Sequence, residues 1–75
     1  MSEYRVAALD TARTYLFEAS WGLSRAGRNL TKHGMEEDGT AEVGREALGL
    51  STRVDALMAV VREAHEAAIS EGDQT

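Results

Sequence analysis

Apolar residues recur at helical spacing along two long segments of the chain. In the first segment, leucines stand seven residues apart with alanines between them: Leu9, Ala12, Leu16, Ala19, Leu23, Ala26 and Leu30. In the second, the spacing alternates between three and four: Val43, Ala47, Leu50, Val54, Leu57, Val61, Ala64 and Ala68. Residues three or four apart share one face of an α-helix. The pattern therefore predicts two amphipathic helices, the first with a stripe of the coiled-coil kind.

The stretch between the two segments, KHGMEEDGTAE, has the residues of a helix end, a turn and a helix start. Gly34 follows Lys32 and His33, and glycine after cationic residues is typical of a helix C-terminus. Asp38, Gly39 and Thr40 are suited to a turn and an N-cap, so the second helix is expected to start near Thr40, or near Met35 if the acidic run is itself helical. No proline interrupts either segment. We predict an all-α fold, a two-helix antiparallel hairpin in one domain, with helices at about 3–33 and 40–71, a turn at about 34–39 and a frayed tail at 72–75.

A lone hairpin of this size leaves one side of its core uncovered. A chain of 75 residues can bury only a small core, and without cysteine it has neither disulfides nor thiolate zinc sites to add stability. Association is the most available remedy. We expect two hairpins to close a four-helix bundle as a homodimer, with a different protein that supplies the missing helices as the alternative.

Phe17 and Trp21 lie to the side of the leucine stripe when residues are placed at about 100° per step. They either widen the core of the hairpin or of its dimer, or anchor a different protein together with Arg25 and Arg28, since aromatic residues and arginine dominate binding hot spots. The predicted interface residues are Phe17, Trp21, Arg25, Arg28, Leu16, Leu23, Leu50, Val54, Leu57 and Val61. The helical glycines are expected where a neighbouring helix comes close or a helix bends: Gly22, Gly27, Gly44 and Gly49.

Charge is unevenly distributed along the chain. Residues 1–34 hold five basic and three acidic groups, whereas residues 35–75 hold three basic and ten acidic groups, for a net charge of −5. The overall acidity argues against nucleic acid or an anionic membrane as partner. No run approaches the roughly 20 apolar residues of a membrane span, and the first residues lack the order of a signal peptide. We expect a soluble, cytoplasmic protein, and the seven arginines against one lysine suggest a bacterial or phage genome.

No catalytic, cofactor or metal site is predicted. A carboxylate-bridged metal site in a bundle needs Glu three residues before His, but Arg62 occupies that place before His65. His33 is expected at the turn, far from His65. The acidic run Glu36 to Asp38 lacks the alternating spacing of a calcium loop, and no serine stands in a nucleophile-elbow motif.

Two short matches resemble known families. The residues LDTAR, from Leu9 to Arg13, resemble the opening of the first helix in all-helical chorismate mutases, where an arginine reaches the substrate carboxylate; the further acidic and arginine positions and a third helix are missing here. An acidic helical hairpin also resembles the small secreted partners of type VII systems, which carry a Trp-x-Gly turn, whereas Trp21 and Gly22 adjoin inside the first predicted helix.

The function predicted from the sequence is non-enzymatic protein association by a small adaptor, inhibitor or regulatory subunit. A secreted or structural hairpin protein is the alternative. A small bundle enzyme that holds an anionic substrate with arginines is the weaker one, and it predicts a concave pocket beside Arg13 or Arg5.

Overall fold

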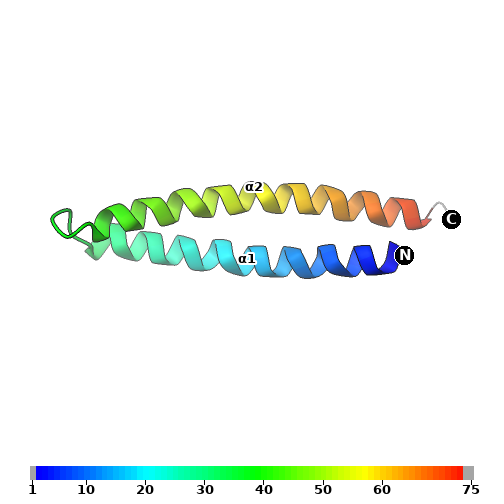
Figure 1. The fold of residues 1–75 in the computed structure, drawn as a ribbon, viewed down its shortest axis with the longest axis horizontal. Helices are drawn as coiled ribbons and strands as arrows, with labels where there is room; N and C mark the ends of the chain where they lie inside the picture. The colour runs from blue at the N-terminus through cyan, green and yellow to red at the C-terminus, as the bar shows by residue number, and fades with distance from the viewer. Residues whose placement is uncertain (1, 74–75) are drawn as a thin grey trace.

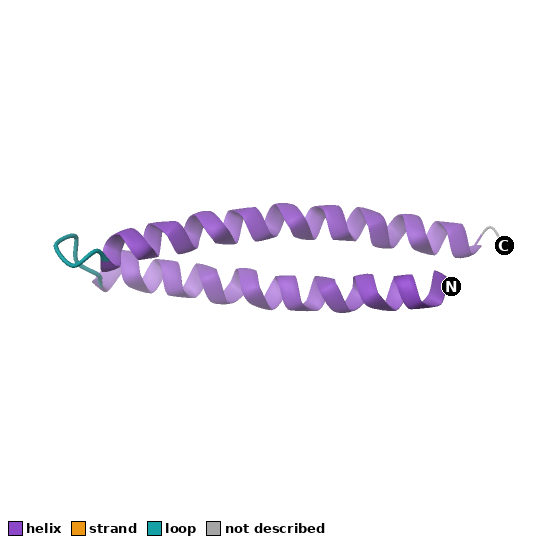
Figure 2. Ribbon diagram, viewed as in Figure 1, coloured by secondary structure: helices purple, strands orange, loops and turns teal. Residues whose placement is uncertain are grey.

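Two long helices packed side by side in opposite directions make up the protein (Figure 1). The computed structural model describes residues 2–73, with α1 at Ser2–His33 and α2 at Thr40–Asp73. Within that range a single turn connects the helices and there is no strand (Figure 2). The all-α hairpin predicted from the sequence is confirmed. α2 continues through two residues of the predicted frayed tail, and the tail's last two residues lie outside the described part.

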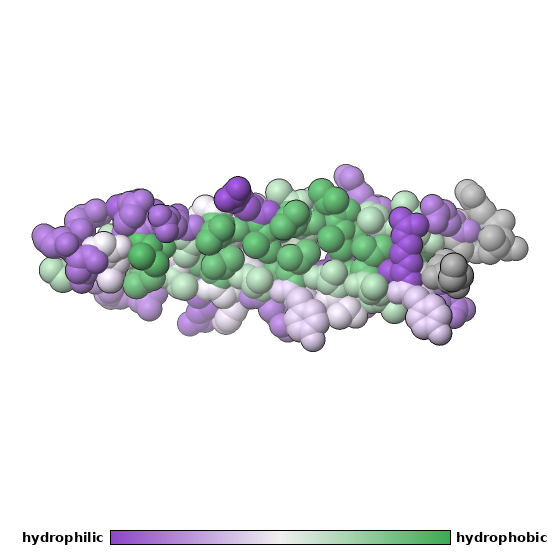
Figure 3. All heavy atoms as spheres, in the orientation of Figure 1, coloured by the Kyte–Doolittle hydropathy of each residue, from purple (hydrophilic) through white to green (hydrophobic). Residues whose placement is uncertain are grey.

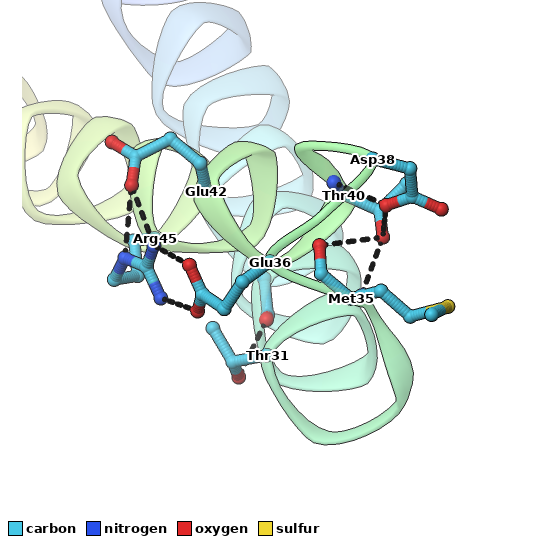
Figure 4. Close-up of polar contacts among 8 residues, drawn as sticks. Thr31, Met35, Glu36, Asp38, Thr40, Glu42 and Arg45 are labelled. Carbon is cyan, nitrogen blue, oxygen red and sulfur yellow. Dashed lines mark hydrogen bonds and ion pairs between the residues drawn. The ribbon is translucent and has the colours of Figure 1, made fainter.

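The turn is closed by backbone and side-chain hydrogen bonds (Figure 4). Thr40 is the first residue of α2, and its hydroxyl accepts a hydrogen bond from the Met35 amide at 2.7 Å and donates to Asp38 Oδ1 at 2.7 Å. The same Asp38 oxygen accepts the Thr40 amide at 3.0 Å. Gly39 has a φ of 81°, a conformation that favours glycine. The Ala41 and Val43 amides donate to the Met35 and Gly39 carbonyl oxygens at 3.2 and 3.1 Å, and these bonds together set the direction in which the chain enters α2.

Arg45 ties the turn to the first turns of α2. Its guanidinium makes a two-pronged contact with Glu36 at 2.8 and 3.0 Å, and its Nη2 donates to Glu42 at 2.6 Å (Figure 4). The hydrogen bonds and charge of Arg45 hold the pKa of Glu36 below its ordinary value, and the Thr40 hydroxyl and amide lower the pKa of Asp38. The acidic run of the sequence is therefore an anchored part of the turn.

Small residues form the contact between the two helices. The most buried positions on α1 are Ser20 and Gly27, and those on α2 are Ala41, Gly44, Ala47, Ser51 and Ala68. We call these residues the small-residue seam. Residues of this size let helix backbones approach more closely than leucines would.

The two helices approach closely at Gly27 and Gly44. A Cβ added to Gly44 would lie 2.8 Å from Leu30 Cβ and 2.8 Å from the Thr31 backbone nitrogen, and one added to Gly27 would lie 2.9 Å from the Gly44 carbonyl oxygen. The expectation of close packing is confirmed at these two glycines. At Gly22 and Gly49 an added Cβ would meet nothing within 4 Å, so no close contact within the hairpin involves these two glycines.

Four hydroxyl and carboxylate groups form a hydrogen-bonded network in the middle of the seam. Ser24 and Ser51 are joined at 2.8 Å, and the Ser51 hydroxyl donates to the Ser20 carbonyl oxygen at 3.2 Å. The Ser20 hydroxyl donates to Asp55. Among the described residues, every buried side-chain polar atom has a hydrogen-bond partner. Burial of these serines is therefore compensated, and the network joins α1 to α2 at one defined register.

Substitution of Gly44 tests the close approach. We expect Gly44→Ala to lower the free energy of unfolding by about 1 to 3 kcal/mol, because the backbone of Thr31 must move to admit the methyl group. Gly49→Ala, on the same helix, is the matched control and should raise stability by up to about 1 kcal/mol through helix propensity. Urea denaturation followed by circular dichroism at fixed protein concentration measures both. Equal stabilisation by the two substitutions would contradict the packing at Gly44.

The Arg45 anchor predicts a pH dependence. The pKa of Glu36 is lowered in the folded chain, so its contact with Arg45 contributes stability above the ordinary pKa of 4.5, and that contribution is lost as the pH falls through the lowered value. We expect Glu36→Gln to lower the melting temperature slightly at neutral pH and to have no effect at strongly acidic pH. Glu37→Gln removes the same charge from a residue with no ion pair to the described chain, and is the control. If the two variants show the same pH profile, the anchor does not contribute.

Candidate protein-interaction surfaces

Leucines and valines that do not fit in the seam gather on one side of the hairpin. On α1 they are half-buried, and they are Leu9, Leu16, Leu23 and Leu30. On α2, Val43, Leu50 and Leu57 expose 53%, 46% and 55% of their surface. We call these seven residues the leucine face. A face of this kind is visible in Figure 3, where apolar side chains cover the middle of the molecule across both helices.

Leu50 and Leu57, two of the predicted interface residues, lie beside the contact between the two helices and stay about half exposed. The predicted stripe and the observed contact share positions seven residues apart, which are Ala47, Val54, Val61 and Ala68. On one side of these four residues, α2 also contacts α1 through Gly44, Ser51 and Met58. The apolar stripe read from the sequence instead continues on their other side, through Leu50 and Leu57. The small residues, and not the leucines, face the other helix because they let the two backbones come closer together. The sequence carried this signal, since Ser20, Gly27 and Gly34 are seven apart, as are Gly44 and Ser51.

A second exposed surface, which we call the aromatic ridge, consists of Phe17, Trp21, Arg25 and Arg28. Phe17 and Trp21 expose 61% and 56% of their surface. The Arg25 guanidinium lies 4.8 Å from the centre of the Trp21 ring, within range of a cation–π interaction. Arg28 Nε donates to the Ser24 carbonyl at 3.4 Å. The two aromatic side chains therefore do not widen the core within one hairpin.

The aromatic ridge and the leucine face lie on different sides of α1. At about 100° per residue, Trp21 is about 160° from Leu23 around the helix, and Phe17 is about 120° from it. A partner bound to one surface does not cover the other. The predicted interface residues thus fall in three places. Four form the aromatic ridge, four belong to the leucine face (Leu16, Leu23, Leu50 and Leu57), and Val54 and Val61 lie in the contact between the helices.

A groove of about 400 Å³ lies beside the ridge, between the two helices. Its lining residues are Asp10, Arg13, Thr14 and Phe17 from α1, with Asp55, Met58, Ala59 and Arg62 from α2. Phe17, Met58 and Ala59 give it an apolar part, and each helix adds one arginine and one aspartate. Thr14 has its hydroxyl bonded to the Asp10 carbonyl at 3.3 Å, and no histidine lines the groove to activate it. Its composition suits an apolar side chain with charged neighbours.

Basic charge is concentrated on α1 around the aromatic ridge. From Thr11 to His33 the helix carries four Lys or Arg residues and one acidic residue, Glu18. Arg13, Arg25 and Arg28 form no ion pair with any described residue. By contrast, α2 carries seven acidic and three basic residues over Thr40–Asp73. The ridge is therefore a cationic surface on an acidic protein.

The two histidines lie at opposite ends of the hairpin, His33 at the turn and His65 near the chain ends (Figure 1). A search of the described residues finds no group of three or more side chains placed to hold a metal ion. Neither α1 nor α2 has an apolar stretch long enough to cross a membrane.

Comparison of the chain with protein-family models, with curated proteins and with solved structures finds no match.

Proposed function

We propose that the protein is a non-enzymatic protein-interaction module that forms a homodimer through its leucine face and acts as a small adaptor, inhibitor or regulatory subunit. The observation that carries this proposal is the position of the large apolar side chains. The seam between α1 and α2 is built from small residues, while Leu50, Leu57 and Val43 stand about half exposed beside it. Two such faces packed together make a four-helix bundle with leucines and valines at its centre.

The exposed area of the chain supports this association. The chain exposes 5629 Å², whereas a compact monomer of 8.1 kDa exposes about 4,500 Å². The excess is about 1,100 Å², and a standard protein interface buries about 800 Å² on each partner. Its source is the elongated shape, 60 × 14 × 13 Å over the Cα atoms. A second copy laid along the leucine face removes a comparable area from water.

Charge supports one arrangement of the two copies. When the two-fold axis runs along the helices, each α1 lies against the partner's α2 and both turns are at the same end. α1 carries five basic and three acidic residues, and α2 carries three basic and seven acidic residues. This arrangement therefore places helices of opposite net charge side by side. The alternative, with the turns at opposite ends, places each helix against its own copy. Complementary charges favour the first arrangement.

Replacement of leucines on this face tests the homodimer. We expect Leu50→Ser with Leu57→Ser to shift the protein from dimer to monomer in sedimentation velocity at micromolar concentration, because the change removes apolar area from the centre of the interface. Phe17→Ser is the matched control. Phe17 is as exposed as Leu57 but lies on the ridge, so its replacement should leave the dimer intact.

The outcomes separate the possibilities. A wild-type protein that is a folded monomer at these concentrations overturns the homodimer. Dissociation by Phe17→Ser, with the leucine variant still dimeric, would move the interface to the aromatic ridge.

A further inference from the structure

We propose that the aromatic ridge, with the groove beside it, binds an acidic amphipathic helix of another protein. This inference rests on the proposed function of protein association and names the chemistry of the second partner. The ridge is the surface that the leucine-face homodimer leaves free.

The ridge has the length and shape of a helix-binding site. Phe17, Trp21 and Arg25 follow one another at intervals of four residues, and Arg28 stands one turn beyond, so the ridge extends about 16 Å along α1. That is three turns of a partner helix. Trp21 and Arg25 lie together, with the guanidinium 4.8 Å from the ring centre, and Trp21 is 56% exposed to a partner. Amphipathic helices dock on such surfaces through side chains at spacings of three and four.

The charges of the ridge select an acidic partner. Arg13, Arg25 and Arg28 have no carboxylate partner among the described residues. Carboxylates on a partner helix would provide charge-assisted hydrogen bonds, and arginine offers them in two-pronged geometry. On α1, Asp10 at the groove and Glu18 are the acidic residues of this region, and no acidic residue of α1 follows Glu18, so positive charge is concentrated around Arg25 and Arg28 although the chain carries −5 overall.

The groove supplies the place for an apolar anchor. Phe17 belongs to both the ridge and the groove, and Met58 and Ala59 line the groove from α2. A leucine of the partner fits against these three side chains. Asp10 and Asp55 also line the groove, and Asp55 accepts a hydrogen bond from Ser20. Because these aspartates repel a carboxylate, the partner's acidic residues belong over Arg25 and Arg28 and its apolar residue belongs in the groove.

Binding of designed peptides tests the proposal. The first probe is a labelled helical peptide of about 18 residues, with leucines on one face and glutamates elsewhere. One control peptide has lysine in place of glutamate, and another has alanine in place of leucine. We expect only the first peptide to bind, as measured by fluorescence anisotropy. Emission from Trp21, the single tryptophan of the chain, should shift to shorter wavelength as the peptide covers it.

Variants of the protein assign the binding to the ridge. Arg28→Glu and Trp21→Ser should each weaken binding about tenfold. Arg53→Glu makes the same charge change on the exposed surface of α2 and should weaken it far less. Leu50→Ser with Leu57→Ser should leave peptide affinity per chain unchanged, because the leucine face is a separate surface.

Each result decides between the two surfaces. Equal binding of the lysine peptide, equal binding of the alanine peptide, or no binding at all overturns the acidic-helix site. Loss of peptide binding in the leucine variant, with Trp21→Ser unaffected, places the peptide on the leucine face instead. Sedimentation of the same samples reports the homodimer independently, so peptide binding to a monomeric wild type would overturn the dimer and leave the ridge site standing.

Discussion

The close approach of the two helices at Gly27 and Gly44 determines the rest of the structure. At this distance the carbonyl oxygen of one helix lies where a methyl group of the other would be, so the positions between the backbones admit only small side chains. Leu48 packs against Gly27, and Val54 and Val61 continue the contact, but the other leucines lie beside it. A hairpin built in this way holds itself together with glycine, alanine and serine, and presents its leucines on a flank. The proposed association through these leucines rests on that geometry.

The serine network fixes the register of α1 against α2, and with it the position of the leucine face. Ser51 meets both Ser24 and the Ser20 carbonyl, and Ser20 in turn meets Asp55. A shift by one heptad would bring Ser51 opposite Gly27 or Arg13 and leave buried hydroxyls without their partners, at a cost of about 1 to 3 kcal/mol for each unsatisfied group. Buried polar groups of this kind select one alignment among several of similar apolar burial. The alignment then sets which leucines and valines stand together on the leucine face.

The sequence predicted the helices and the turn well because their determinants are local. The start of α2 at Thr40 and the glycine that follows the end of α1 can be recognised from a few neighbouring residues. The packing could not be predicted in the same way. Hydrophobic periodicity locates the most apolar stripe of each helix, and it assumes that this stripe faces the partner helix. Here the contact is displaced from that stripe toward Ser20 and Ser51, because backbone proximity and hydrogen bonds outweigh apolar volume. The sequence did place the aromatic ridge away from the leucine stripe, because the angle of about 100° between successive residues is the same in any α-helix.

Two surfaces on different sides of one helix have a consequence for what such a protein can do. In a bundle closed through the leucine faces, the ridges of both copies remain on the outside, since Trp21 and Leu23 lie about 160° apart around α1. A dimer therefore presents the same cationic, aromatic site twice. Two linked sites bind a partner with two matching segments more strongly than either site alone, and they can also hold two partner molecules together. A monomer has one such site, so it could neither bind a partner through two segments nor hold two partner molecules together. The division of the apolar residues between two faces of α1 thus favours an adaptor over a simple one-to-one inhibitor.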